Sequence, residues 1–128
     1  NIGRAVAEGI AYHPNSKMVD RKMLVDKALG EVGLESRRWR ASSAFELSGG
    51  QCQRAAIARA IISNPKLIIC DECTSALDVT VQARIMDLLE RLQRDYGMAF
   101  MFISHNRALV QNFCDRVYSF DRADGEGA

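Results

Sequence analysis

The chain has 128 residues, of which 48% are hydrophobic and 26% are charged, and its formal net charge at pH 7 is +1. This composition is that of an ordinary globular protein, and the near-zero charge argues against a nucleic-acid-binding groove or an acidic tail. No apolar run approaches the roughly 18 residues that span a bilayer, and the sequence from Asn1 shows no signal-peptide pattern. Because the sequence begins with Asn1 and not with an initiator methionine, we expect the chain to be part of a longer protein.

The N-terminal part of the chain is predicted to be helical. A weak helical pattern runs from Asn1 to about Tyr12 and ends in a break at residues 13–16. A clearer amphipathic helix is expected from Val19 to Val32, with Gly33 as its stop. The arginine-rich segment 35–41 fits a solvated helical face better than a nucleic-acid contact.

A glycine-rich turn, LSGGQ, occupies residues 47–51 and leads into a helix predicted from Cys52 to Ile62. Ser48 is a good helix-capping residue, and the two glycines permit close backbone approach and unusual backbone angles. The N-terminus of a helix presents free N–H groups and the positive end of the helix dipole, a combination that binds phosphates. An ordinary helix cap is the alternative interpretation when such a motif stands alone.

Two apolar runs, residues 67–70 and 98–103, are predicted to be buried parallel strands. The amphipathic segment 79–96 between them is predicted to be a helix, which makes a βαβ unit. A short helix is expected to end near Phe113, and residues 116–120 are a candidate third strand. The polar tail, residues 121–128, is expected to be frayed.

Polar side chains follow both predicted strands. Asp71 and Glu72 come directly after the first strand, and His105 comes after the second, at the same edge of the sheet. Asp71 is placed to hold Mg²⁺ through water, and Glu72 is placed to orient or deprotonate an attacking water. His105 is either a surface histidine or a donor to a terminal phosphate. Asp78 is either the last residue of a capping box that begins at Ser75 or itself an N-cap.

The chain contains four cysteines, and Cys70 and Cys73 form a C-x-x-C motif that encloses the two acids. Such a motif raises a zinc or redox hypothesis. No second C-x-x-C occurs, and Cys70 completes an apolar run. Unpaired cysteines in a core are therefore the preferred interpretation.

Taken together, LSGGQ, the LIICDE strand, SALD and a strand ending in SH resemble the second half of an ATP-binding cassette (ABC) ATPase. The run SALDVTVQARI is similar to the ATP-binding subunits of dipeptide, oligopeptide and nickel importers. The resemblance implies an α/β fold, in which a partial P-loop NTPase (RecA-like) core with a parallel βαβ unit is joined to a helical subdomain. Residues 1–46 would belong to the helical subdomain, 47–62 to the signature motif and its helix, and 63–128 to the core.

The resemblance also implies roles, with ATP and Mg²⁺ as the ligands of a full-length dimer. Asp71 would assist the metal, Glu72 would be the catalytic carboxylate and His105 would contact the γ-phosphate. Asp78 would help communication across the dimer. The signature residues would close over a nucleotide bound to the opposite subunit; they are Ser48, Gly49, Gly50 and Gln51. The partners would be a second ATP-binding subunit and transmembrane permease subunits, with no nucleic acid, at the cytoplasmic face of the cell membrane.

Some features depart from the family pattern. No G-x-x-x-x-G-K-[ST] motif occurs in the 128 residues, so we expect that the isolated chain neither binds ATP tightly nor hydrolyses it. Cys73 replaces the usual proline, Asn106 stands where an acid is common, and Cys52 stands where a basic or polar residue is usual. Two alternatives remain: a non-catalytic ABC fragment or interaction module, and an ABC ATPase of DNA repair. The second is disfavoured because the chain has no sustained heptads.

Overall fold

The computed structural model describes residues 1–12, 20–34 and 37–120. Some predicted features lie outside the described residues: the break at residues 13–16, the first residue of the helix expected from Val19, the start of the arginine-rich segment and the tail at residues 121–128.

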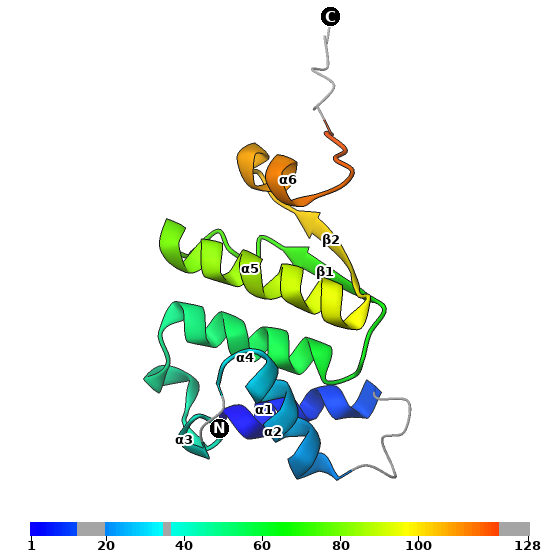
Figure 1. Cartoon of the computed structure of the whole chain (residues 1–128). Helices are drawn as coiled ribbons and strands as arrows, with labels where there is room; N and C mark the ends of the chain where they lie inside the picture. The colour runs from blue at the N-terminus through cyan, green and yellow to red at the C-terminus, as the bar shows by residue number, and fades with distance from the viewer. Residues whose placement is uncertain (13–19, 35–36, 121–128) are drawn as a thin grey trace, which may run out of the picture.

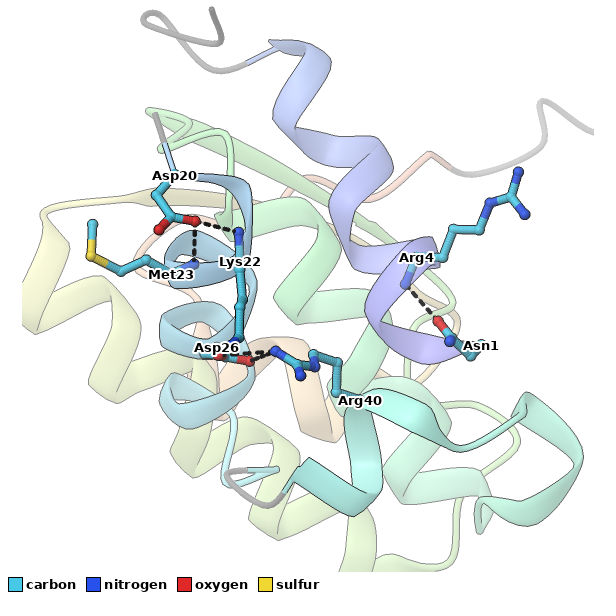
Figure 2. A network of polar contacts seen from close by, with 7 residues as sticks. All are labelled: Asn1, Arg4, Asp20, Lys22, Met23, Asp26 and Arg40. Atoms are coloured by element: carbon cyan, nitrogen blue, oxygen red, sulfur yellow. Dashed lines mark hydrogen bonds and ion pairs between the residues drawn. The ribbon is translucent and has the colours of Figure 1, made fainter. Parts of the chain in front are cut away.

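The N-terminal part is helical, as predicted. Helix α1 (Ile2–Ala7) continues into the 3-10 turn η1 (Glu8–Tyr12), and α2 (Arg21–Glu31), α3 (Arg37–Ala41) and the 3-10 turn η2 (Ala44–Glu46) follow. Short polar side chains decide where two of these helices begin (Figure 2). The Asn1 side chain accepts a hydrogen bond from the backbone N–H of Arg4, and the Asp20 carboxylate accepts two from the start of α2. Each such cap satisfies N–H groups that have no partner within the helix.

Helix α3 is joined to α2 by an ion pair between Arg40 and Asp26 (Figure 2), with an N–O distance of 3.0 Å. Because both side chains are partly exposed to solvent, the pair contributes little to stability, about 0–1 kcal/mol. Closer packing holds α3 against α1, since a Cβ at Gly3 would lie only 2.3 Å from Cγ of Arg40. Helix α2 ends where Gly33 adopts a left-handed conformation, φ +74°, which confirms the predicted stop.

Helix α4 (Gly49–Ile61) begins earlier than the predicted Cys52. The reason is a complete capping box at its first turn. The Ser48 hydroxyl accepts from the Gln51 N–H at 3.3 Å, and Oε1 of Gln51 accepts from the Ser48 N–H at 2.9 Å. This reciprocal pair of bonds lets both glycines enter the helix in spite of their low helix propensity.

The remaining elements are β1 (Leu67–Asp71), α5 (Val79–Tyr96), β2 (Ala99–Ile103) and α6 (Arg107–Phe113). β1 and β2 are parallel neighbours, with Asp71 opposite Ile103, so the predicted βαβ unit is confirmed. Figure 1 shows α5 lying between the two strands and α4. Helix α5 ends at Gly97, which adopts a left-handed conformation with φ +64°. The buried face of α5 consists of Ile85, Leu88, Leu89 and Leu92.

Two predictions about the sheet are wrong. The strands are not buried on both sides: in β1 Leu67 and Ile69 are 52% and 58% exposed, and in β2 Met101 is 45% exposed. The reason is that α5 covers one face of the sheet, and no element in the described residues covers the other. Residues 116–120 are not a third strand, because the described sheet consists of β1 and β2 alone and no hydrogen-bonded ladder reaches this segment.

A salt-bridged contact ties α5 to α2 at the side away from the sheet. Arg91 donates to Oε2 of Glu31 at 3.2 Å and also to the Glu31 carbonyl oxygen. The Tyr96 hydroxyl donates to Oε1 of the same carboxylate. This cluster fixes the last turn of α2 against the second half of α5.

One hydrophobic core runs through the described residues. Its most fully buried large side chains come from α1, η1, the end of α2 and α5; they are Ile10, Ile85, Leu89, Leu92, Val6 and Val32. The proposed division of the chain at residues 46 and 62 stays a prediction. None of the described helices is long and apolar enough to cross a membrane.

Candidate active site

Glu72 and His105 meet at the carboxyl ends of the two strands. The backbone N–H of Glu72 donates to the carbonyl oxygen of Ile103 at 2.9 Å, which extends the ladder by one bond beyond β1. Oε1 of Glu72 accepts from the His105 backbone N–H at 3.1 Å and lies 2.9 Å from Nδ1 of the His105 ring. The predicted meeting of these two residues at one sheet edge is therefore confirmed.

The backbone at Glu72 adopts a conformation that is unfavourable for a residue with a side chain. Its φ is +47°, in the left-handed region, which costs of order 1–3 kcal/mol and persists only where surrounding contacts enforce it. Ser75 supplies such contacts, because its backbone N–H and its hydroxyl both donate to the Glu72 carbonyl oxygen, at 3.2 and 2.9 Å. The turn after β1 thus aims the Glu72 side chain toward the end of β2.

The contacts of the Glu72 carboxylate favour its ionised form. The hydrogen bond from the His105 side chain, helped by the one from the His105 backbone, lowers the pKa of Glu72, while partial burial opposes this effect. The second oxygen, Oε2, is shielded from solvent and has no hydrogen-bond partner among the described residues. A shielded carboxylate oxygen without a donor is costly, and it can accept a hydrogen bond from a water molecule.

The donor set at this edge suits a hydrated magnesium ion. Asp71, the last residue of β1, is exposed. The next residue in the chain is Glu72, whose Oε2 has no hydrogen-bond partner among the described residues. Within the described ranges, no group of three or more His, Cys, Asp and Glu side chains is arranged to hold a metal ion. Magnesium usually keeps several waters and is bound through one or two carboxylates plus substrate phosphates, whereas a structural zinc site needs four protein ligands. The two carboxylates therefore fit Mg²⁺.

The LSGGQ turn is the other predicted part of the site. Neither Gly49 nor Gly50 has a positive φ, so the unusual backbone angles that glycine permits are not used here. The glycines serve the close approach instead: a Cβ at Gly50 would lie 2.6 Å from Cγ1 of Val81, and one at Gly49 would lie 3.4 Å from Cδ2 of Leu77. No hydrogen bond in the described part of the chain uses the N–H of either glycine, so the N-terminus of α4 presents free donors.

Asp78 is the N-cap of α5, and its carboxylate accepts from the Val81 N–H at 2.9 Å. The alternative capping box is wrong, since the Ser75 hydroxyl is engaged with the Glu72 carbonyl oxygen. Leu77 and Val81, the residues that meet the two glycines, flank Asp78 in the chain, so the starts of α4 and α5 lie together. Among the described residues, no hydrogen bond or ion pair joins the LSGGQ turn to Glu72 or His105.

The cysteines beside the acids are free thiols. Cys70 is buried under the sheet, and its hydrogen bond with Cys73 raises the pKa of the Cys70 thiol. The same hydrogen bond lowers the pKa of Cys73. Cys114, which follows α6, lies near Cys70.

Sequence reasoning missed several residues that position the site. Ser75 holds the Glu72 carbonyl oxygen, and the Gln82 side chain donates to the buried Thr74 hydroxyl at 3.0 Å, which ties the turn to α5. Asn106 caps α6, since its side-chain oxygen accepts from the Leu109 N–H at 3.1 Å. The spacing of Asn106 before the apolar residues of α6 is the N-cap signal that would have identified it. Nothing in the sequence marks the roles of Ser75 and Thr74.

The family model described as ABC transporter matches residues 4–75. This range is more than half of the chain, and the chain belongs to the ABC transporter family. The match includes the LSGGQ turn, β1 and both acids that follow β1.

The chain is similar to the oligopeptide transport ATP-binding protein OppF of Salmonella typhimurium, with 46% identity over 117 residues that cover 91% of this chain and 35% of OppF. It spans about a third of the length, or less, of the curated relatives it matches. These relatives are ATP-binding subunits of importers for oligopeptides and glutathione, which agrees with the predicted importer type.

Solved structures confirm the predicted fold class, a partial P-loop NTPase core with a helical subdomain. One is cbiO1 from Clostridium perfringens, part of the ABC transporter complex cbiONQ, with a TM-score of 0.77 and 30% identity over 90% of this chain and 45% of that one. Another is the dimeric ATP-binding cassette MJ0796 bound to ADP and Pi, with a TM-score of 0.68 and 30% identity over 83% of this chain and 46% of that one.

Proposed function

We propose that this chain is part of the ATP-binding subunit of a peptide importer, and that the whole subunit hydrolyses ATP. Support comes from membership of the ABC transporter family and from the similarity to OppF, an oligopeptide transport ATP-binding protein. The solute class that we propose is peptides, since OppF is named an oligopeptide transport protein and GsiA a glutathione import protein, and glutathione is a tripeptide.

The observation that carries this proposal is the contact between Glu72 and His105. His105 engages Oε1 of Glu72 and leaves Oε2 without a partner. In the proposed reaction Glu72 accepts a hydrogen bond from the attacking water and orients it, as a positioned carboxylate base does. His105 holds that carboxylate in place and donates to the terminal phosphate from the same edge of the sheet.

Asp71 is proposed to hold Mg²⁺ through water at the end of β1. When bound, the ion would neutralise charge on the phosphate oxygens. The contribution of the chain itself is to present an exposed carboxylate from a rigid strand, directly before the turn that places Glu72.

The LSGGQ turn is proposed to act on a nucleotide held by a second subunit. Ser48, Gly49, Gly50 and Gln51 present a helix N-terminus with free N–H groups, which suits a terminal phosphate, yet no hydrogen bond among the described residues ties them to Glu72. Gly49 and Gly50 pack against residues at the start of α5, next to Asp78. Asp78 is therefore a candidate for transmitting a movement of the LSGGQ turn between the two subunits. The similar cassette MJ0796 is described as dimeric. We propose the same for this protein, together with permease partners at the cytoplasmic face of the membrane.

The test is the change Glu72→Gln in the full-length protein. Turnover of ATP should fall by about 10²–10⁴-fold, the usual worth of a positioned base, while ATP binding is retained because the amide keeps the shape of the side chain. Asp87→Asn, on the exposed side of α5, is the matched control for loss of one carboxylate. Unchanged turnover in Glu72→Gln would remove Glu72 from this role.

A second candidate is a non-catalytic interaction module. The specific observation in its favour is the exposed apolar face of the sheet, formed by Leu67, Ile69, Met101 and Ile103. Calorimetry with Mg-ATP on the 128-residue chain separates the cases: we expect no tight binding, and sub-micromolar affinity would contradict that expectation. A Walker-A loop encoded ahead of Asn1 would favour the first candidate.

A further inference from the structure

We propose that Arg54 is a positioning residue for the LSGGQ turn, because its hydrogen bond to the end of α2 sets the direction in which that turn faces the second subunit. The bond joins Nη1 of Arg54 to the carbonyl oxygen of Val32 at 2.7 Å, across 22 positions of the chain. The inference rests on the proposed action of the LSGGQ turn on a nucleotide held by that subunit, and it adds a residue outside the turn.

The acceptor of this bond lies at the end of a helix. Val32 is the C-cap of α2, and Gly33 follows it in the left-handed conformation. The Gly33 N–H donates to the Gly30 carbonyl oxygen at 2.9 Å, which closes the last turn. The Val32 carbonyl therefore lies at the negative end of the helix dipole, where a cationic donor is favoured.

The guanidinium group of Arg54 is closely surrounded. Arg54 is partly buried, and within the described ranges its side chain forms no ion pair with an acid. A Cβ added at Gly33 would lie 3.2 Å from Nη1 of Arg54, so the end of α2 packs tightly against this group. Because a hydrogen bond from a charged donor is stronger than a neutral one, the Val32 carbonyl fixes where the Arg54 side chain lies.

The end of α2 is anchored by other contacts as well. The residue before Val32 is Glu31, whose carboxylate accepts hydrogen bonds from Arg91 and Tyr96 of α5. Arg54 therefore fastens α4 to a turn that α5 already holds. The last turn of α2 is thus a fixed point to which the helix that carries the LSGGQ turn is attached.

Two contacts about one helical turn apart define the tilt of the first half of α4. Gly50 packs against Val81 at the start of α5, and Arg54 is bonded to the end of α2. Without the Arg54 bond, the Gly50 contact remains as a pivot about which α4 can tilt. The free N–H groups at the start of α4 would then point in a less defined direction, which weakens their hold on a phosphate.

Association of two full-length subunits in the presence of ATP tests the inference. The background is Glu72→Gln, in which we expect bound ATP to stay intact. Analytical ultracentrifugation measures the dissociation constant of the dimer, and calorimetry measures ATP binding to the single subunit. Adding Arg54→Gln should weaken the dimer about tenfold, since a hydrogen bond from a charged group is lost. ATP binding to the single subunit should stay unchanged.

Arg59→Gln is the matched control, because it removes the same charge from the same helix. Arg59 pairs with Glu8 of η1 at 2.9 Å, and more than half of each side chain is exposed. This pair lies further from the LSGGQ turn, so the dimer should be as tight as in the parent. Arg54→Lys keeps a charged donor and should retain most of the affinity that Arg54→Gln loses. Equal weakening at positions 54 and 59 would contradict a specific role of Arg54.

Gly33→Ala disturbs the same bond from the side of α2. Alanine disfavours the left-handed conformation of Gly33, and its Cβ would press against Nη1 of Arg54. Gly33→Ala should therefore weaken the dimer too, and its effect should not add to that of Arg54→Gln. Fully additive effects would show that the two residues act separately, and would overturn the inference.

The outcomes also separate this inference from the proposed function. A dimer as tight in Arg54→Gln as in the parent would overturn the role of Arg54 alone. A weaker dimer that comes with an equal loss of ATP binding to the single subunit would assign Arg54 to the fold. If the Glu72→Gln parent binds ATP and does not associate, the proposed role of the LSGGQ turn fails, and the inference fails with it.

Discussion

The His105 ring lies 2.9 Å from the Glu72 carboxylate, although the two residues are 33 positions apart in the chain. The parallel register produces this contact: Asp71 is opposite Ile103, so the residues that follow each strand emerge side by side. The whole of α5 is the connection that makes such a register possible, because parallel strands need a crossover. The contact between Glu72 and His105 therefore depends on the complete βαβ unit, that is, on both strands and the helix that connects them.

Replacing His105 by Ala should separate its proposed catalytic role from any structural one. The His105 side chain is 82% exposed, and surface substitutions usually change stability by no more than about 0.5 kcal/mol. Turnover of ATP by the full-length protein should fall, because Glu72 loses its ring contact while keeping the backbone one. Thermal unfolding and steady-state turnover are the two measurements. A large loss of stability with unchanged turnover would assign His105 to the fold instead.

Gly50 should tolerate no added side chain. A Cβ at Gly50 would lie 2.6 Å from Cγ1 of Val81, so Gly50→Ala should destabilise the chain by about 1–3 kcal/mol through overpacking. Gly49→Ala is the matched control, since its Cβ would make an ordinary contact at 3.4 Å. Adding Val81→Ala to Gly50→Ala should restore part of the loss. Denaturant unfolding measures all three, and equal stability of the two single variants would contradict the packing argument.

Asp78 offers a way to distinguish a helix cap from a charge that relays signals. Asp78→Ala removes the acceptor for the Val81 N–H and should cost about 1 kcal/mol. Asp78→Asn keeps a good cap and should leave stability nearly unchanged. If Asp78→Asn still alters dimer-dependent turnover in the full-length protein, the charge has a role beyond the cap. If both variants lose the same stability, the cap assignment fails.

The contact between Tyr96 and Glu31 predicts two pH limits to stability. The hydrogen bond from Tyr96 lowers the pKa of Glu31, so its stabilisation is present above the ordinary carboxyl value of about 4.3 and is lost as the pH falls. The same hydrogen bond raises the pKa of Tyr96 to about 12. That contribution is complete below the unfolded value of about 10 and is lost as the pH rises toward 12.

Glu31→Gln tests the alkaline limit. Without the carboxylate, the pKa of Tyr96 should fall from about 12 toward the ordinary phenol value. Ultraviolet titration measures it in a background where the exposed Tyr12 and Tyr118 are changed to Phe. Tyr96→Phe is the matched control and should remove the perturbed titration altogether. A Tyr96 pKa that does not move in Glu31→Gln would contradict the contact.

Local patterns in the sequence were enough to predict most of the elements. The amphipathic period and Gly97 predicted α5 at its observed bounds. Ser48 was recognised as a capping residue, although α4 begins at Gly49 and not at the predicted Cys52. The meeting of Glu72 and His105 was also predictable, because acids and a histidine directly follow the two apolar runs. Helix caps and strand ends are local properties, which a single sequence carries.

Strand pairing, the need for glycine in the LSGGQ turn and the conformation of Glu72 were decided by the tertiary structure alone, because each depends on which residues lie opposite in space. Residues 116–120 have the composition of a strand, yet no neighbouring edge pairs with them. Gly50 is required by the side chain of Val81, 31 positions further along the chain, and the Glu72 conformation is held by Ser75 and Ile103. The sequence by itself determined the family, most of the elements and the candidate residue types of the site. The packing determined which oxygen of the Glu72 carboxylate is left without a partner.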